Sequence, residues 1–253
     1  MIDLGALSAT AWALLVVAAL LLGFSKTAIG GIAMVSVAIF AAVLPARPST
    51  GVVLLLFLIG DVIAVRAYTK YADWSILRRL APFVAVGIVV GAVFLKFAGD
   101  AAVRRTIGVV LLVLVCVALA VKWQRRSLPT DVEPEPPSTV LTVATATGSG
   151  FTSMVANAGG SFLALYLLHV RLPVMVFLGT TAWFFFAVNL VKLPITLALG
   201  LVSVHTLQLV LILSPALVTG ALVGRAVAKR MSLGVFEWIV LVVTFAAALN
   251  LVR

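Results

Sequence analysis

The sequence predicts an all-α polytopic membrane protein made of two inverted repeats of about five helical segments each, with broken or re-entrant helix hairpins at the centre. Three observations lead to this fold class. Hydrophobic residues fill 64% of the 253 positions and charged residues only 10%, whereas soluble domains are about half apolar and about a quarter charged. Several apolar stretches approach the roughly 20 residues that a spanning helix needs. The two halves of the chain also repeat each other at matched positions.

Apolar runs and their punctuation divide the chain into two membrane repeats. In the N-terminal repeat, residues 1–122, we expect helical segments at residues 6–22, 29–44, 50–68, 80–97 and 106–122. In the C-terminal repeat, residues 138–253, we expect them at residues 138–150, 158–169, 174–192, 206–224 and 235–252. No Lys or Arg precedes the first run, so it lacks the basic start of a cleaved signal peptide and is expected to stay as a membrane segment. Residues 123–137, rich in Pro and acidic residues, are the predicted linker.

The internal repeat is the strongest architectural signal. Four residues recur exactly 133 positions later: Pro82, Gly87, Gly91 and Lys96 as Pro215, Gly220, Gly224 and Lys229. Upstream, shorter matches recur 127 to 129 positions later: Gly23-Phe24-Ser25 as Gly150-Phe151-Thr152, Gly30-Gly31 as Gly159-Gly160, and Phe57 and Asp61 as Phe185 and Asn189. An odd number of segments in each half makes the second half enter from the opposite side, as in many secondary transporters.

The distribution of basic residues predicts the orientation. The net charge is +10, but the cations lie in short loops and form no basic stripe with interleaved aromatic residues, which argues against nucleic-acid binding. The loops that share a side with the 123–137 linker carry most of the Lys and Arg, and this excess marks the cytoplasmic side. We therefore expect a multi-pass protein of a bacterial-type cytoplasmic membrane with both termini outside.

Two stretches interrupt the helical pattern at matched places, Gly23 to Gly31 and Gly148 to Gly160. Each is predicted to be a hairpin tip, because paired glycines permit tight turns and neighbouring hydroxyl and amide groups satisfy irregular backbone inside lipid. A helix that restarts after such a break directs free N–H groups and a partial positive charge at its N-terminus, which favours an anion. The alternative is that the glycines only allow close helix packing and that the hydroxyls bond to their own helices.

Charged residues at membrane depth are the other candidates. Asp61 and Asn189 occupy equivalent mid-helix positions, and Lys192 follows Asn189 on the same helical face. Lys26 lies between apolar flanks and either reaches an interface or meets a partner, whereas Arg66 either turns inward or anchors at the interface. Asp61 has two open roles: a proton acceptor for coupling, or a fixed counter-ion to Lys26, Arg66 or Lys192.

Catalytic and cofactor chemistry finds little support in the sequence. His169 and His205 have no second ligand at helical spacing, so we expect no metal site. Ser149 lies between two glycines, but no positioned His and acid accompany it as in a serine hydrolase. Cys116 lies in an apolar segment and is expected to serve packing. The chain has no Gly-rich nucleotide-binding motif, so we expect no cofactor and energy from a gradient or a partner chain.

The chain resembles the sulfite exporter TauE/SafE family, also called the TSUP family. The features that carry the resemblance span most of the chain: Gly23-Phe24-Ser25 with Gly30-Gly31, Asp61 followed by Tyr71-Ala72-Asp73-Trp74, Asn157 with Gly159-Gly160, and Asn189-Leu190-Val191-Lys192-Leu193-Pro194. The resemblance implies a secondary transporter, commonly an exporter, of a sulfur-containing anion such as sulfite, sulfoacetate or another organosulfonate. Protons are a candidate coupling ion.

The predicted substrate-binding residues combine both lines of reasoning. They are Ser25, Lys26, Thr27, Gly30, Gly31, Arg66, Thr152, Ser153, Asn157, Gly159, Gly160, Asn189 and Lys192. Asp61 is the predicted coupling residue, and no catalytic or metal-binding residue is expected. An anion channel is the main alternative function. A membrane-embedded hydrolase using Ser149 or Ser153 with His169 or His205 is a further one, and a structural subunit is disfavoured by the matched helix breaks.

Overall fold

The computed structural model describes residues 4–5, 7–27, 32–127, 137–170, 172–227 and 233–252. Within these ranges the chain forms ten α-helices and one short 3-10 helix. They are α1 (Ala9–Thr27), α2 (Ala33–Val43), α3 (Ala46–Tyr68), η2 (Thr69–Tyr71), α4 (Trp74–Phe97), α5 (Asp100–Ser127), α6 (Thr139–Ala156), α7 (Gly160–Val170), α8 (Val174–Ala198), α9 (Val204–Val227) and α10 (Leu233–Val252). The all-helical fold predicted for a polytopic membrane protein is confirmed for the described residues.

Helix length separates spanning from shorter elements. Among the described residues, six helices are long and apolar enough to cross a membrane: α1, α3 with η2, α4, α5, α8 and α9. By contrast, α2 and α7 have 11 residues each. At about 1.5 Å per residue they reach about 16 Å, roughly half of the hydrocarbon thickness. The bundle therefore contains two short helices at matched places, each directly after a predicted tip.

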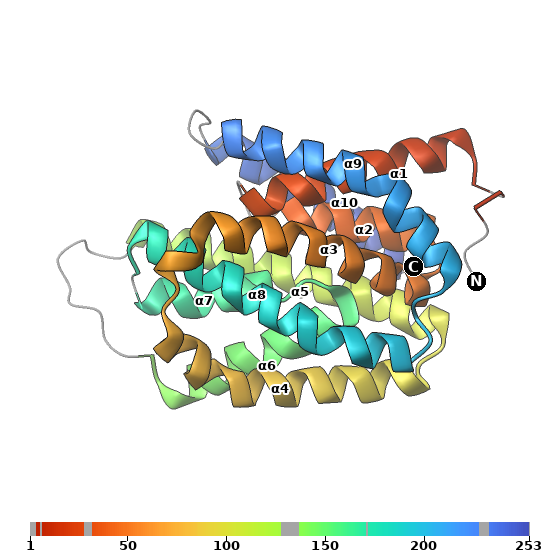
Figure 1. The fold of residues 1–253 in the computed structure, drawn as a ribbon. Coiled ribbons are helices and arrows are strands. Elements are labelled where there is room, and N and C mark those ends of the chain that lie inside the picture. Colours follow the sequence, from red (N-terminus) through yellow and green to blue (C-terminus); the bar gives the residue numbers. More distant parts are fainter. Residues whose placement is uncertain are drawn as a thin grey trace.

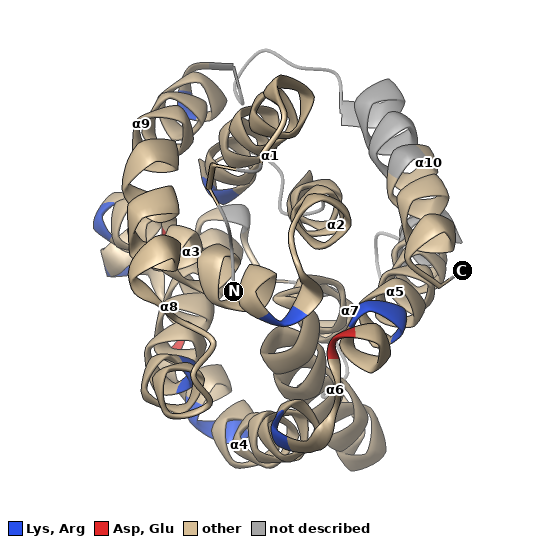
Figure 2. Ribbon diagram, turned by 90° about the vertical axis from the view of Figure 1, so that its right-hand side faces the viewer, with Lys and Arg blue, Asp and Glu red and all other residues tan. Residues whose placement is uncertain are grey.

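The helices lie side by side along one direction (Figure 1). The start of α1 and the end of α10 lie at one end of the bundle, and the end of α5 and the start of α6 lie at the other. Seen along the helices, α2 and α3 are enclosed by the outer helices, and Lys, Arg, Asp and Glu occupy few positions on the ribbon (Figure 2). The outward faces of α4 and α9 carry exposed apolar side chains such as Val89 and Leu211, as expected for a surface in contact with lipid.

Local sequence explains several helix boundaries. Pro45 and Pro173 immediately precede α3 and α8, where a proline fits because the first helical N–H groups have no intrahelical partner. The Asp73 carboxylate caps α4 by accepting hydrogen bonds from the backbone N–H groups of Ser75 and Ile76. Gly200 takes a left-handed conformation, with φ of 67°, two residues after α8 ends.

Repeat-related glycines bring helices of opposite halves into close contact. A Cβ on Gly23 of α1 would collide with the carbonyl oxygen of Leu217 in α9, and one on Gly150 of α6 with that of Val84 in α4. The reverse contacts are matched too, because Gly220 faces Leu20 and Gly87 faces Thr147. Small residues at such crossings let backbones approach closely in membranes. In each half, then, the helix that leads into the tip packs on the fourth helix of the other half.

The predicted breaks begin too early in the sequence. Residues 23–27 continue α1, and residues 148–156 continue α6, so the irregular backbone in the second half is confined to residues 157–159. The reason is that Gly23 and Gly150 serve helix crossings rather than turns. The alternative of close packing therefore holds for these two glycines. Gly30 and Gly31 lie outside the described residues.

Candidate functional site

The helices α1 and α6, called here the tip helices, end inside the bundle beside charged side chains. The second one stops at Asn157, which adopts a left-handed conformation with φ of 51°. Its backbone N–H and that of Ala158 close the last turn by donating to the carbonyl oxygens of Ser153, at 3.0 Å, and Thr152, at 3.2 Å. A helix C-terminus carries a partial negative charge and unsatisfied carbonyl groups. Each tip therefore needs a positive partner.

Lys192 of α8 provides that partner for α6. Its ammonium nitrogen lies 2.6 Å from the carbonyl oxygen of Ser153, 2.6 Å from Asn157 Oδ1, 3.2 Å from Ser153 Oγ and 3.2 Å from Asn189 Oδ1. The side chain is among the largest fully buried ones, with an exposed fraction of 1%. Four oxygen neighbours surround a group with three N–H donors. The hydrogen-bonding capacity of Lys192 is fully used within the protein.

The neighbouring amides direct their oxygens toward Lys192. The Asn157 amide nitrogen donates to the carbonyl oxygen of Thr50, at 2.9 Å, and the Asn189 amide nitrogen donates to Asp61 Oδ2, at 2.6 Å. These contacts orient the amides with Oδ1 toward Lys192. Three of the four oxygens around the Lys192 nitrogen therefore accept, and the fourth, Ser153 Oγ, is a hydroxyl that can also donate.

Lys26, in the last turn of α1, takes the corresponding place in the first half. Its ammonium forms an ion pair with Asp61 Oδ1. The rings of Phe57 and Phe185 lie beside it, with centroids 3.9 Å and 5.4 Å from the nitrogen. These two phenylalanines are equivalent in the repeat, and both present π-faces that attract cations. Gly60 makes room for the lysine stem, since a Cβ there would lie 2.8 Å from Lys26 Cγ.

These contacts join into one polar network across both halves. It runs from Lys26 to Asp61, through Asn189 to Lys192, and on to Ser153 and Asn157. Asp61 and Asn189 are each 1% exposed, and the Lys26 side chain is 11% exposed. Lys26 contacts the carboxylate directly and Lys192 reaches it through Asn189, at a depth where unpaired charge is costly. The network thus contains two basic side chains and one carboxylate.

The family model described as Sulfite exporter TauE/SafE matches residues 15–251 of the chain. The chain belongs to this family. Membership implies a multi-pass membrane transporter of sulfite-type anions, which agrees with the long apolar helices. None of the curated proteins or solved structures compared with the chain matches it significantly.

Several residues predicted for the TauE/SafE site lie beside the network but direct their polar atoms elsewhere. The hydroxyl of Ser25 donates to the carbonyl oxygen of Leu22, at 2.7 Å, and that of Thr152 to Gly148, at 2.7 Å, within their own helices. Thr27 donates to the carbonyl oxygen of Ala221 in α9, at 2.8 Å. For these three hydroxyls the structure shows helix stabilisation and helix packing. Their role toward substrate stays a prediction.

The two glycines at the second tip differ in their surroundings. The carbonyl oxygen of Gly159 accepts a hydrogen bond from Ser149 Oγ, at 2.9 Å, and a Cβ at Gly159 would lie 2.5 Å from the carbonyl oxygen of Ser149. Gly160 starts α7, and a Cβ there would meet only Phe185, at 3.6 Å. The close approach that requires a glycine is therefore at position 159.

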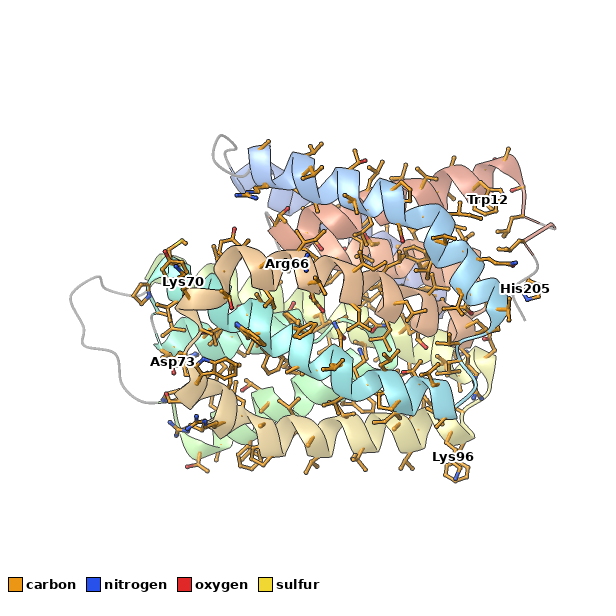
Figure 3. The ribbon with its side chains drawn as sticks, viewed as in Figure 1. Trp12, Arg66, Lys70, Asp73, Lys96 and His205 are labelled. Carbon is orange, nitrogen blue, oxygen red and sulfur yellow. The ribbon has the colours of Figure 1, made fainter. Side chains whose placement is uncertain are left out.

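Arg66 does not join the network. Its side chain is exposed on α3 (Figure 3), and it forms no hydrogen bond or ion pair among the residues that the structure describes. No contact among the described residues supports the alternative in which Arg66 turns inward. By contrast, Lys26 contacts Asp61 and Lys192 contacts its partner Asn189. Lys26 lies in the last turn of its own helix, which explains why it can turn back to α3.

Sequence reasoning missed three parts of the site. It did not identify the Thr50 carbonyl group, the Phe57 and Phe185 rings, or Gly60. Two signals were available: the phenylalanines were found in the repeat, and Gly60 immediately precedes the only acidic residue in the middle of an apolar segment. The Thr50 contact joins residues 107 positions apart and leaves no local pattern.

The residues considered for the hydrolase alternative are not assembled with one another. Ser149 donates to the Gly159 carbonyl group, at 2.9 Å, and Ser153 Oγ contacts Lys192. His169 Nδ1 pairs with the carbonyl oxygen of Leu165, at 2.8 Å, one turn back in its own helix. His205 is exposed at the end of the bundle where α9 begins (Figure 3). Among the described residues, no group of three His, Cys, Asp or Glu side chains is placed to hold a metal ion.

Proposed function

We propose that this TauE/SafE family member is a secondary transporter, not an enzyme, that exports a small sulfur-containing anion such as sulfite, sulfoacetate or another organosulfonate. One observation carries the proposal: the partly buried Lys26 and the buried Lys192 lie beside the carboxylate of Asp61 at the ends of the two tip helices. An excess of positive charge inside a membrane bundle favours an anion. A sulfonate group has three oxygens, and each can accept hydrogen bonds from ammonium, amide or backbone N–H donors.

The anion is proposed to bind beside Lys26 and Asn189, between the tips. The second tip contributes the N-terminus of α7 at Gly160, whose first backbone N–H groups have no acceptor within the helix and favour an anion. Phe185 contacts this start of α7 and also Lys26. The side chain therefore links the two tips, and movement of either tip changes the surroundings of the ammonium.

The proposed mechanism is alternating access between two inverted repeats, residues 1–122 and 138–253. The matched glycine crossings support it, because each tip helix packs on the other half through equivalent positions. An exchange of conformation between the halves would then open the site to the opposite side. Both termini are proposed to lie outside a bacterial-type cytoplasmic membrane. Reporter fusions after Arg253 and within residues 130–137 test this orientation, and a cytoplasmic C-terminus would contradict it.

Counterflow in proteoliposomes tests the transport function. Vesicles loaded with unlabelled sulfite, sulfoacetate, taurine, thiosulfate or sulfate receive a trace of labelled sulfite outside. A carrier accumulates the label transiently and saturates, whereas a channel gives unsaturated flux without accumulation. Lys26→Gln should abolish counterflow. Lys96→Gln is the matched control, because Lys96 is exposed at the bundle end and also lies near a ring, with 5.6 Å between its nitrogen and the Phe97 centroid. Absence of flux for all five loaded compounds would contradict the proposal.

A further inference from the structure

Lys26 and Lys192 differ in how much of their hydrogen-bonding capacity the described residues use. Lys192 has four oxygen neighbours for three N–H donors. Among the described residues, Lys26 has one oxygen partner, Asp61 Oδ1, and otherwise faces the Phe57 and Phe185 rings. A ring attracts a cation more weakly than a carboxylate or sulfonate oxygen does. Within the described part of the chain, Lys26 is therefore the lysine with N–H donors left for an anion.

Asp61 has both carboxylate oxygens engaged, and the two partners differ in chemistry. Oδ2 accepts from the amide of Asn189, at 2.6 Å, which is held in turn by Lys192. Oδ1 accepts from Lys26, whose charge an incoming anion would compete for. Each carboxylate oxygen has two lone-pair sites, and a proton at Oδ1 leaves the hydrogen bond from Asn189 in place. Protonation of Asp61 removes the negative charge that holds the Lys26 ammonium and so frees it for another acceptor.

Few other charges face this pair. α3 packs against α1, α2, α5, α8, α9 and η2. Among the described side chains of these helices, only Lys26 from α1 and, through Asn189, Lys192 from α8 contact the carboxylate. The other titratable side chains described on them, and on α3 itself, are Arg47, Arg66, Tyr68, Lys70, Tyr71, Asp100, Arg104, Arg105, Cys116, His205 and Arg225, and none of them contacts Asp61. A pH effect on anion binding therefore traces to Asp61, Lys26 or Lys192, and Asp61→Asn separates the carboxylate from the two lysines.

We infer that Asp61 and the transported anion compete for Lys26, so that each singly charged anion is carried together with one proton. This inference rests on the proposed transport function. In the loading step a proton from water binds Asp61 Oδ1, the hydrogen bond from Lys26 to Oδ1 breaks, and the freed N–H group donates to an oxygen of the anion. Asn189 stays on Oδ2 throughout. The added proton and monoanion cancel, so loading leaves the buried charge of Lys26, Lys192 and Asp61 unchanged. Cargo and proton together carry no net charge, so export by this route follows an outward gradient of the anion that outweighs any inward proton gradient.

Methanesulfonate is the probe of choice, because it is fully ionised from pH 5 to pH 8 and any pH dependence then belongs to the protein. Its binding to purified protein is measured by calorimetry. If one proton binds with each anion, the wild-type dissociation constant should rise about tenfold per pH unit wherever free Asp61 is ionised. In Asp61→Asn, which lacks the competing charge, it should be independent of pH and equal to the tight limit of the wild type.

Two further variants keep the result independent of folding. Lys26→Gln combined with Asp61→Asn removes both charges of the pair and should fold but bind no methanesulfonate at any pH. Lys96→Gln should match the wild type. In proteoliposomes, uptake of methanesulfonate by the wild type should be driven by an inward proton gradient and should not respond to a potassium diffusion potential.

The outcomes separate this inference from the function on which it rests. Wild-type binding that does not depend on pH, a pH dependence that persists in Asp61→Asn, or potential-driven uptake would each overturn the proton-for-anion inference while transport stands. Transport of sulfite without any binding of methanesulfonate would overturn it too, because the monoanion site would be absent. If no anion is transported at all, the proposed function fails first.

Discussion

The ends of α1 and α6 solve the same electrostatic problem with different residues. Each tip helix stops inside the bundle and meets an ammonium group, but α1 carries Lys26 in its own last turn, whereas α6 has Ser153 at the equivalent position and receives Lys192 from α8. The position equivalent to Lys192 in the first half is Ala64. The repeat therefore preserves the place of the charge rather than the residue that supplies it. The helix that supplies the lysine determines how many oxygen atoms surround its side-chain nitrogen.

The difference in anchoring follows from one small residue. Gly60 in α3 leaves a groove for the stem of Lys26, while the equivalent position in α8 is the buried Val188. A lysine reaching inward from the end of α6 would find no such groove. In the second half the cation enters from α8 itself and is enclosed by oxygens, and in the first half it rests between a carboxylate and two rings.

The largest expected effect comes from removing the enclosed lysine. Lys192→Met keeps the length of the side chain but leaves two oriented amide oxygens without a donor and removes one of the two donors to the Ser153 carbonyl group. Each buried polar group left without a partner costs about 1–3 kcal/mol. Thermal unfolding in detergent should show a large loss of stability, well above that of Lys26→Met combined with Asp61→Asn, which leaves no buried carboxylate unpaired. Equal losses in the two variants would contradict the difference drawn between the tips.

Much of this arrangement was predictable from sequence, and the rest was not, for physical reasons. Composition and the repeat predicted the membrane bundle, the matched tips, and Asp61, Asn189 and Lys192 at depth. The boundaries of the tips were wrong because a glycine that opens a turn and a glycine that admits a neighbouring backbone look alike in sequence. Gly23 meets Leu217, 194 positions away, and only the fold reveals that partner.

The site was predicted as a set of residues but not as a network. Lys26 could equally have reached an interface, and the ion pair with Asp61 depends on the crossing of α1 with α3 and on the room at Gly60. Hydroxyl groups near the tips were expected to face the substrate. Ser25 and Thr152 instead bond one turn back, which is always available to Ser and Thr in a membrane helix and leaves no mark in the sequence.

Filling the groove at Gly60 should give α3 the bulky side chain that α8 has at the equivalent position, Val188. In Gly60→Val the new Cβ would lie 2.8 Å from Lys26 Cγ and displace the lysine stem. Overpacking of this kind costs about 1–3 kcal/mol. We expect moderate loss of stability with complete loss of sulfite counterflow. Gly99→Val is a control at an open position, since a Cβ there would meet nothing within 4 Å. Wild-type counterflow in Gly60→Val would show that Lys26 needs no groove.

The first turns of α4 and α9 offer a smaller contrast between the halves. The Asp73 side chain caps α4, whereas α9 is capped by the Ser203 hydroxyl, which accepts from the backbone N–H of Thr206 at 3.2 Å. A hydrogen bond from the Ser75 hydroxyl, with further ones from the backbone N–H groups of Ile76 and Ser75, holds the pKa of Asp73 below its ordinary value of 3.8 in spite of partial burial. Because folding lowers this pKa, the stabilisation is present above the ordinary value and is lost as the pH falls through the lowered one.

Hydrogen exchange can follow the two caps separately. Between pH 5 and pH 3 the amides of the first turn of α4 should lose protection, after correction for intrinsic exchange, while those of α9 should not, since a hydroxyl does not titrate there. Asp73→Ala should cost about 1 kcal/mol at neutral pH, the usual value of an N-cap, and should abolish the acid effect. An equal acid response at both helices would show that the caps do not control it.

The smallest effect is expected from substitution of Arg66. A small effect there would show that the anion site depends on the lysines and not on this arginine. Arg66 lies in the last turn of α3, its side chain is exposed, and the equivalent position in the second half is Pro194, so the repeat places no cation there. A cation at an exposed helix C-terminus stabilises by about 0.3–1 kcal/mol through the helix dipole. Arg66→Gln should therefore lower the melting temperature only slightly and leave the half-saturating sulfite concentration in counterflow unchanged. Lys26→Gln, measured in parallel, should lose counterflow altogether. A large rise in the half-saturating concentration for Arg66→Gln would place this arginine on the path of the anion in another conformation, because in this structure no contact joins it to the network.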